Sequence, residues 1–555
     1  MLRHISLLLL SAFSAYWVRV LTPLHPMSLL LIPLIALLVW LGNQVFQSGV
    51  RVPVANLLPA ILFSLFTVFS HYSAFPSLLD ACICASVLVY PFLLLCTVLF
   101  DKLQTLPARR SMSSSRRHFF VYQALILLCW MPFVLTSYPG VLNTDSIWQI
   151  QQALGDAPLS NHHPVVHTLL LRALLTIGKA LFNGNVSHAL GLASIVQMLF
   201  LSACMAYTLC SMQRMGAPRL LSIGTVLFYG LVPFHAVFSI THLKDSWFAG
   251  FFLLFCSTFG KALLTSQSLT TADYLLVFIS SIGLGLFRSN GLYLVATLTV
   301  CVLLFLRSNR KLCLAIGCAL LICLCVLGPV FGRLQVISVD PVEYLSVPLQ
   351  QISRIYADGF ALSQADEQLL ATLIDPQLLP FTYYARISDP IKNLIRDSGH
   401  QEVLLANKGA FFRLWLRALW QYPSSAFHAY VDLTDGFWFP ESTGIPYVIN
   451  SDPNPYGLSS NGVLPASVKA FFSPFYHPNQ QQSALAPFYS CGNYVWLMLV
   501  LFFFSFRKGK PLFYLPGIFL WGTLLLTTPV YSDIRYLYAI IVATPLFLLS
   551  AFPAE

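Results

Sequence analysis

Long apolar runs separated by short polar turns dominate the sequence. These runs, mostly of roughly 17 to 25 residues, are long enough for a helix to cross a bilayer, and they recur about fourteen times. The runs that predict membrane-spanning helices are 5–21, 28–46, 54–71, 78–100, 119–137, 187–210, 220–240, 247–264, 274–287, 292–306, 312–331, 488–506, 511–527 and 536–552. The pattern therefore predicts an all-α polytopic membrane protein.

Composition supports this class. The 555 residues are 57% hydrophobic and 9% charged, with a mean hydropathy of +0.73. The net charge of +10 could suit a nucleic-acid partner, but the basic residues cluster in short loops between apolar runs, as cytoplasmic loops do. We therefore expect no nucleic-acid partner. The 13 cysteines lie nearly all in apolar runs, where they act as small hydrophobic residues, and no CxxC pair has zinc-site spacing.

The basic loops predict one orientation in the membrane. The loop after the fourth run is strongly basic, and we place it in the cytoplasm because Lys and Arg favour that side. Counting runs from there puts every other basic loop on the same side. The basic residues concerned are Lys102, Arg109, Arg110, Arg116, Arg117, Arg214, Arg219, Arg307, Arg310, Lys311, Arg507, Lys508 and Lys510. We expect a multi-pass protein of the plasma or inner membrane with both termini cytoplasmic.

These crossings divide the chain into four parts. We expect a four-helix N-terminal extension with its basic loop, a membrane core, a small mixed external domain and a three-helix C-terminal segment, at 1–118, 119–331, 332–486 and 487–555. The core includes a first external loop at 138–186. In the external domain, the run FFRLWLRALWQYP at 411–423 suits either a helix lying on the membrane surface or a core helix of the domain.

One stretch, 138–168, interrupts the apolar pattern with many ionisable groups. These are Asp145, Asp156, His162, His163 and His167. Polar groups at membrane depth are costly and usually mark function, whereas the alternative is a solvated connector. Pro164 can begin a helix that would place His163 and His167 four residues apart on one face. Asp145 can cap the amphipathic segment SIWQIQQAL and still face a cavity.

Other ionisable groups fall on the same predicted external side. They are Lys244, Asp245, Arg288, Asp533 and Arg535. Lys and Arg favour cytoplasmic loops, so the predicted external position of Lys244, Arg288 and Arg535 calls for an explanation. Each alone could be an interfacial side chain with its charge in water. Together, beside a loop of carboxylates and histidines, they predict an anion site.

In layout, the chain resembles the GT-C superfamily of integral membrane glycosyltransferases, which take a sugar from a polyprenyl-phosphate carrier on the external face. The resemblance begins at the fifth run and rests on the first external loop, YPGVLNTD followed by SIWQIQQALG and HHPVVHTLLLRALLTIG. In closer detail, the YPG-D-Q-QA-G-HHP-HT pattern, with LKD, FRSNG, PLQQISRI and RYLYAIIVATP, is similar to an uncharacterised bacterial family of polytopic membrane proteins.

The resemblance implies roles for individual residues. Asp145 would act as general base or orient the acceptor, while Lys244, Arg288 and Arg535 would hold the carrier phosphate. The residues implied to line the cavity are His162, His163, His167, Asp245, Asp533 and Tyr536. The implied partners are a lipid-linked sugar donor, a glycan, lipid or protein acceptor, and the bilayer of the cell envelope.

The acidic motif departs from the resemblance in one respect. Family members often carry paired acidic residues in this loop, whereas Thr144 precedes the single Asp145 here. We therefore expect no cofactor. A divalent metal is the less favoured alternative, because His163 and His167 at helical spacing would find only Asp145 as an obvious further ligand.

Two other functions remain open from the sequence. A secondary transporter also combines many spans with polar groups, but it tends to place them near the bilayer midplane and to show inverted repeats. Here the groups gather at one face. A polysaccharide polymerase or ligase of the cell envelope would share the external loop rich in Arg and His. An acidic residue in the cavity would distinguish a glycosyltransferase from it.

Overall fold

The protein is helical wherever its structure is described. The computed structural model describes residues 2–22, 30–47, 54–109, 114–440, 454–476 and 485–553, and within these ranges it contains helices and isolated bridges but no strand. The predicted all-α class is confirmed for this part of the chain. Several predicted features lie wholly or partly outside it, namely Arg110, the start of the run at 28–46 and parts of the 332–486 region.

Every predicted crossing coincides with a helix. The helices are α1 (Leu2–Leu21), α2 (Leu31–Gln47), α3 (Val54–Ser70), α4 (Leu78–Gln104), α5 (Arg116–Ser137), α8 (Val186–Arg214), α9 (Arg219–Leu231), α10 (Pro233–Ile240), α11 (Lys244–Leu264), α12 (Thr271–Phe287), α13 (Ser289–Phe305), α14 (Arg310–Cys325), α24 (Cys491–Phe506), α25 (Leu515–Thr527) and α26 (Ile534–Leu549). Of the described residues, five helical segments are long and apolar enough to span a membrane, and eight more are apolar but shorter. Membrane association is therefore supported, while the count of about fourteen crossings stays a prediction.

Proline disturbs the regular α-helix in two of the predicted crossings and breaks one of them. The run at 220–240 forms α9 and α10, which bend by 54° at Val232 and Pro233. Proline cannot donate its backbone N–H and clashes with the preceding turn, so α9 ends and Pro233 begins the next helix. The run at 312–331 likewise passes from α14 into a π-helical turn, Val326–Val330, that contains Pro329.

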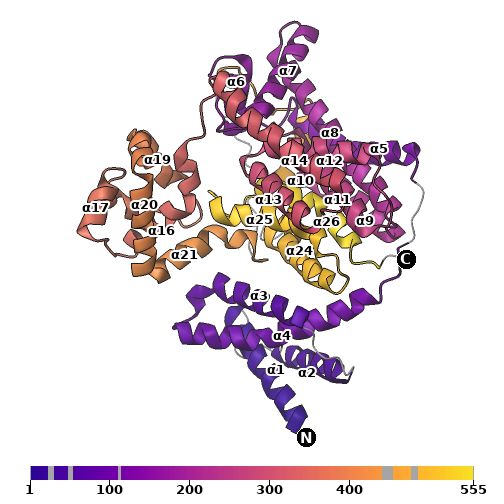
Figure 1. The fold of residues 1–555 in the computed structure, drawn as a ribbon, viewed down its shortest axis with the longest axis vertical. Helices are drawn as coiled ribbons and strands as arrows, with labels where there is room; N and C mark the ends of the chain where they lie inside the picture. The colour runs from indigo at the N-terminus through magenta and orange to yellow at the C-terminus, as the bar shows by residue number, and fades with distance from the viewer. Residues whose placement is uncertain are drawn as a thin grey trace.

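Three bodies are visible in Figure 1. Helices α1 to α4 form a layer at the N-terminal end, and α3 packs along α4. The central body is built around α11, which packs against α8, α12 and α26. Helices α6 (Thr144–Leu154) and α7 (Val165–Leu181) project from this body, and both belong to the predicted first external loop.

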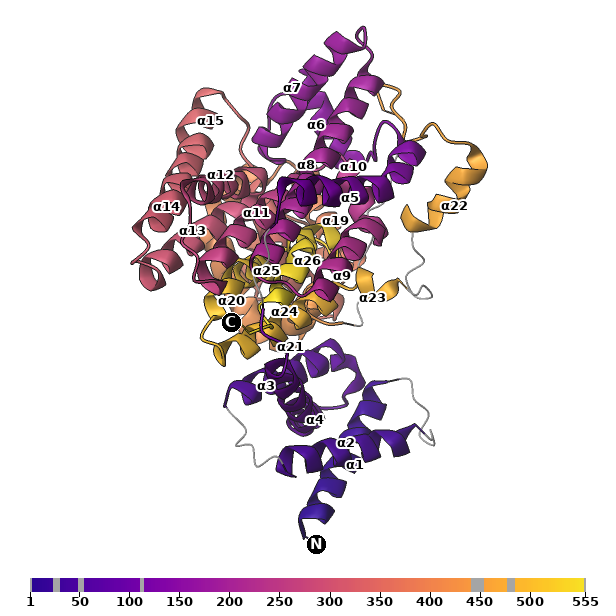
Figure 2. The same ribbon diagram turned by 90° about the vertical axis from the view of Figure 1, so that its right-hand side faces the viewer.

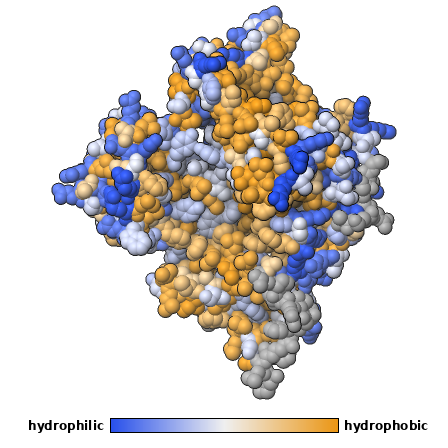
Figure 3. Space-filling model, viewed as in Figure 1, coloured by the Kyte–Doolittle hydropathy of each residue, from blue (hydrophilic) through white to orange (hydrophobic). Residues whose placement is uncertain are grey.

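The third body is a helical domain with its own core. Its main helices are α16 (Ser346–Ala357), α17 (Gln364–Ala371), α19 (Asp389–Asp397), α20 (Gln401–Gln421) and α21 (Pro423–Thr434). Its core includes Val342, Ile352 and Leu414. In Figure 3 hydrophilic residues gather over this domain at the left, whereas apolar residues cover much of the centre. The sequence left the fold of this domain open, and its described residues form helices and no strand.

One helix near the end of the 332–486 region packs away from the helical domain. Helix α22 (Ala466–Tyr476) packs against α5 and α10 of the central body rather than against the helical domain. In α20, Phe411 and Leu414 are buried in the domain core, so the core-helix interpretation of 411–423 holds for that face. The opposite face leaves Phe412, Leu416 and Trp420 exposed.

The basic and the mixed polar clusters lie at opposite ends of the central helices. Lys244 begins α11, and Leu264 ends it roughly 30 Å away at 1.5 Å per residue. The Leu264 carbonyl accepts hydrogen bonds from Arg109 at 2.9 Å and from Lys510 at 3.2 Å. Two loops that the sequence assigned to the cytoplasm thus meet at one end of α11. Lys244, one of the candidate site residues, lies at the other end. Which end faces outward stays a prediction.

Candidate functional site

A cavity of about 250 Å³ lies between the central body and the helical domain. It collects most of the residues that the sequence singled out, although they come from distant segments. Those lining it are Asp145, His162, His163, Lys244, Asp245, Arg288, Arg535 and Tyr536. His167 and Asp533 lie outside this lining. The cavity also takes in Ser289, Asn290, Glu343, Tyr344, Asp389 and Lys392, which the sequence analysis did not select.

Arg535 joins two acidic residues across the cavity wall. Its Nη1 donates to Asp145 Oδ2 at 2.8 Å, and its Nε donates to Asp533 Oδ2 at 2.6 Å. Asp533 is the N-cap of α26 and also accepts the Arg535 backbone N–H at 3.0 Å. This cap satisfies an otherwise unpaired amide of the first turn. Asp533 therefore orients Arg535 from behind instead of lining the cavity.

The cations around Asp145 set its ionisation. Burial alone would raise the pKa of this carboxyl, but the charge and hydrogen bond of Arg535, with the charge of Lys244, lower it to about 2. Asp145 is thus ionised at neutral pH, and it is a weak base for as long as Arg535 holds it. In this arrangement the carboxylate can accept a hydrogen bond from a substrate hydroxyl more readily than it can take the proton.

Arg288 and Asp245 form a second, more deeply buried pair. The Arg288 Nη1 lies 3.3 Å from Asp245 Oδ1, and the two side chains are 6% and 2% exposed. Arg288 also donates to the Tyr536 carbonyl at 3.2 Å and lies over the rings of Phe248 and Tyr536. Neither Asp245 oxygen accepts a hydrogen bond from the described residues. The attraction of Arg288 is what compensates the desolvation of this carboxylate.

Lys244 differs from the other lining cations. Its Nζ lies 3.2 Å from His163 Nδ1, and among the described residues it forms no ion pair with a carboxylate. Burial and the neighbouring Lys244 lower the pKa of His163 well below its usual range, so its ring is neutral and Nδ1 accepts from the ammonium. Lys244 therefore presents a positive charge that no carboxylate of the described residues neutralises by direct contact.

Backbone contacts hold the Asp145 and Lys244 loops together. Val141 donates its N–H to the Ile240 carbonyl at 3.0 Å, and a bridge joins Val141 to Thr241. Gly140 has a φ of +156°, and a Cβ there would lie 2.4 Å from Ser194 Oγ. This close approach requires glycine. The YPG motif thus brings the first external loop against the start of α11.

The cap of α6 is not the residue that we expected. Asn143 is the N-cap, accepting the Ser146 N–H at 2.7 Å, and Asp145 lies within the first turn. The capping role predicted for Asp145 is therefore wrong. Asn143, two positions earlier, caps the helix, which leaves the Asp145 carboxylate to face the cavity.

His163 and His167 do not share a helical face, because α7 begins at Val165 with Pro164 as its N-cap. His163 precedes the helix and turns toward Lys244. His167 is buried in the first turn, where Nδ1 lies 3.1 Å from Gln149 Oε1, and burial lowers its pKa to about 3. The structure thus makes His167 a packing residue between α6 and α7.

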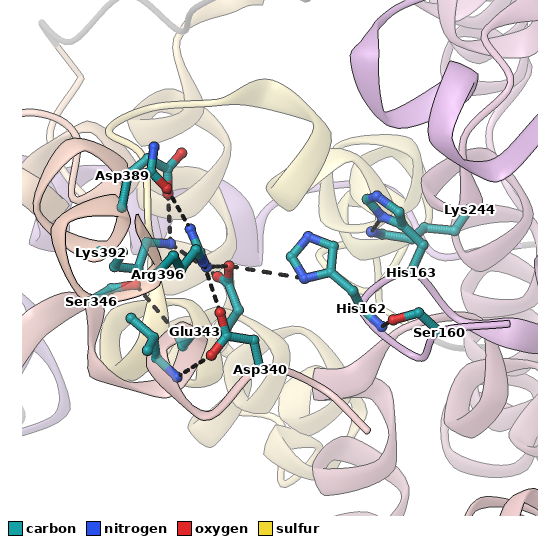
Figure 4. A network of polar contacts seen from close by, with 12 residues as sticks. Ser160, His162, His163, Lys244, Asp340, Glu343, Ser346, Asp389, Lys392 and Arg396 are labelled. Carbon is teal, nitrogen blue, oxygen red and sulfur yellow. Dashed lines mark hydrogen bonds and ion pairs between the residues drawn. The ribbon is translucent and has the colours of Figure 1, made fainter. Parts of the chain in front are cut away.

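The helical domain supplies a second charged network at the cavity edge (Figure 4). Lys392 is 1% exposed, and its Nζ lies 2.9 Å from Glu343 Oε2 and 2.6 Å from Asp389 Oδ1. Arg396 binds Asp340 at 2.7 Å and also pairs with Glu343. His162 faces this network, with Nδ1 4.0 Å from Glu343 Oε1. Local sequence gives no sign of these residues, since charged side chains are ordinary in a polar domain.

Among the residues that the structure describes, no three His, Cys, Asp or Glu side chains converge closely enough to hold a metal ion. His163 and His167 point to different partners, and the Asp145 carboxylate is paired with Arg535.

Residues 153–554 match the model of a family of unknown function (DUF6020). The chain belongs to this family. The matched part includes Lys244, Arg288 and Arg535, the cations of the cavity, and begins after Asp145. No curated protein and no solved structure matches the chain. The family description names no activity, so the functional argument rests on the cavity.

Proposed function

We propose that this protein is a membrane glycosyltransferase of the GT-C type. It would move a sugar from a polyprenyl-phosphate-linked donor to a glycan, lipid or protein acceptor on the external face of the cell membrane. The proposal includes a membrane domain of about fourteen crossings with a GT-C-like core. One observation carries the proposal: the Lys244 ammonium, without a carboxylate partner among the described residues, shares a cavity with the Asp145–Arg535 ion pair.

The chemistry requires both signs of charge at one place. A bond forms between the acceptor oxygen and the anomeric carbon of the sugar, while the bond from that carbon to the carrier phosphate breaks. The acceptor oxygen loses its proton, and the polyprenyl phosphate departs with additional negative charge. A fixed cation near the leaving oxygen stabilises that charge, and a carboxylate near the acceptor hydroxyl orients it and receives the proton.

In this scheme Lys244 binds the carrier phosphate first, since it has no contact to give up with a carboxylate of the described residues. Arg535 then exchanges Asp145 for the phosphate, because Asp533 keeps the guanidinium at the cavity wall. Losing Arg535 raises the pKa of Asp145 from about 2 toward its ordinary value of 3.8 and makes it a better proton acceptor. Donor binding would thus activate the base. Arg288 adds positive potential but keeps Asp245 as its partner.

Structural features distinguish this proposal from its two alternatives, a secondary transporter and a polysaccharide polymerase or ligase. The bent pair α9–α10 is a feature that a secondary transporter would share, yet the charged cavity lies at the end of α11 and not midway along it. A polysaccharide polymerase or ligase would use the cations without needing Asp145. The acidic member of the cavity favours the glycosyltransferase.

The test is a reconstituted assay with polyprenyl-phosphate sugars in proteoliposomes. Lys244→Gln should weaken carrier binding by about thirtyfold or more, since removing one partner of a buried charged contact costs on the order of 2 to 5 kcal/mol. Lys244→Arg should retain much of the binding. The matched control is Lys311→Gln, which removes an exposed lysine outside the cavity. Sugar movement across the membrane without a new glycosidic bond would instead establish a transporter.

A further inference from the structure

An apolar groove of about 840 Å³ lies on the membrane body, away from the candidate site. It runs between α9, α24 and α26, with α23 (Ala486–Tyr489) at its edge, and Figure 2 shows these four helices grouped together. Along α9 it extends from Leu220 to Phe228, which is about 12 Å at 1.5 Å per residue. We call it the α9–α26 groove.

The polar atoms of the groove wall are bonded within the protein. The hydroxyls of Thr225 and Thr544 donate to carbonyls four residues earlier in their own helices, at 2.7 and 3.1 Å. Tyr494 donates its hydroxyl to the Phe488 carbonyl at 3.0 Å, and Asn493 donates to Pro487 at 2.9 Å. The groove therefore offers hydrocarbon contacts, which suit an acyl chain better than a polar ligand.

Basic side chains lie near one end of this groove. Leu106, Pro107 and Phe552 line that end. The backbone N–H of Arg109 donates to the Pro553 carbonyl at 2.8 Å, and Lys508 Nζ donates to the Ala551 carbonyl, so both residues lie beside Phe552. These are the basic loops that the sequence assigned to the cytoplasm.

Two further cations complete the cluster. Lys510 shares the Leu264 carbonyl with Arg109. Arg219 is exposed at the first position of α9, directly before Leu220 and Leu221 of the groove. Among the described residues, none of Arg109, Arg219, Lys508 and Lys510 forms an ion pair with a carboxylate.

Within the described ranges no carboxylate pairs with this cluster. Burial, together with the charges of Arg109 and Lys510, lowers the pKa of Lys508 to about 8. Like charges this close destabilise one another, and an anion bound among them would relieve the repulsion.

We infer that the α9–α26 groove and this cationic cluster together bind an anionic glycerophospholipid. One acyl chain would lie along α9, and the phosphate would contact Arg109, Lys508 and Arg219. The inference is independent of the proposed activity, because no residue that lines the cavity also lines the groove. Charge and hydrocarbon occur together here in the arrangement of a lipid whose headgroup lies at the membrane surface.

Native mass spectrometry of the full-length protein in detergent tests the headgroup. The protein is titrated with phosphatidylglycerol and with phosphatidylcholine of the same acyl chains. We expect preferential retention of phosphatidylglycerol, weakened about fivefold by Arg219→Gln and by Lys508→Gln, since each surface cation contributes about 1 kcal/mol toward an anionic lipid. The control is Arg310→Gln, which changes the exposed first residue of α14. Equal retention of the two lipids would overturn the inference.

A pair of glycine substitutions tests the groove itself. A Cβ at Gly224 would meet nothing within 4 Å, so Gly224→Leu fills the groove without displacing the protein. Gly522 on α25 is equally open but outside the groove, and Gly522→Leu is the matched control. Loss of phosphatidylglycerol retention in Gly224→Leu alone is the expected result. Unchanged retention, or preferential retention of polyprenyl phosphate added in competition, would refute the phospholipid assignment.

Discussion

Arg535 Nη1 lies 2.8 Å from Asp145 Oδ2, although 390 residues separate the two in the sequence. Arg535 lies in the first turn of α26, and Asp145 lies in the first turn of α6. Arg535 is further held by Asp533, so its position is fixed by α26 and not by Asp145. The carboxylate can therefore lose this partner to a phosphate without the guanidinium leaving the cavity.

Replacement of Asp145 by Asn is expected to abolish transfer while leaving the protein folded. The amide keeps the shape of the side chain but cannot accept the proton, and loss of one acid or base group costs about 10²- to 10⁴-fold in rate. Initial rates with polyprenyl-phosphate sugars measure the effect, and donor binding should persist. Asp397→Asn, an exposed aspartate at the end of α19, is the control. Turnover near that of the control would remove Asp145 from the mechanism.

Acidification should remove the stabilising effect of the Asp145–Arg535 pair. The folded-state pKa of Asp145, about 2, is below its ordinary value of 3.8, so the stabilisation is fully present above about pH 4 and is lost as the pH falls toward 2. Thermal unfolding of the wild type and of Asp145→Asn across this range measures it. The difference in Tm should be largest near neutrality and shrink with acid. A difference that grew as the pH fell would contradict the ion pair.

Arg288→Ala should destabilise the fold, by about 3 to 5 kcal/mol, because it leaves the buried Asp245 carboxylate without its cation. The double variant Arg288→Ala/Asp245→Asn should recover much of this loss, since the amide is neutral. Thermal unfolding compares the two variants. Binding of polyprenyl phosphate distinguishes a structural role of Arg288 from a role in ligand binding. If the double variant is stable but binds polyprenyl phosphate weakly, Arg288 contributes to the site as well as to the fold. If the double variant is no more stable than Arg288→Ala, buried-charge pairing is not the reason for the loss.

Labelling of introduced cysteines should show that the cavity end of the membrane body is external. Ser398 lies at the exposed end of α19, and Arg310 begins α14 on the predicted cytoplasmic side. An impermeant thiol reagent applied from outside should modify Ser398→Cys and spare Arg310→Cys, each in a background without exposed native cysteines. The reverse pattern would invert the topology and place the proposed chemistry in the cytoplasm.

Sequence pattern located the helices well but not their breaks. Each apolar run became a helix, because burial of an apolar segment in a membrane fixes both its length and its hydrogen bonding. The run at 220–240 nevertheless forms two helices that meet at Pro233, and α10 is bent by 54° from α9. The sequence contained the proline, but its consequence depends on whether neighbouring helices accommodate a kink or a break.

The sequence by itself determined the all-α membrane class, the helix positions and the choice of Asp145, Lys244, Arg288 and Arg535, because hydropathy and misplaced charge can be read locally. Only the tertiary structure decided which of these charges pair. In the part of the chain that the structure describes, it gave Lys244 no carboxylate partner and placed His167 between α6 and α7. It also brought Glu343 and Lys392 to the cavity edge. Ion pairing depends on separations of a few ångströms, and those distances are set by the packing of segments far apart in the chain.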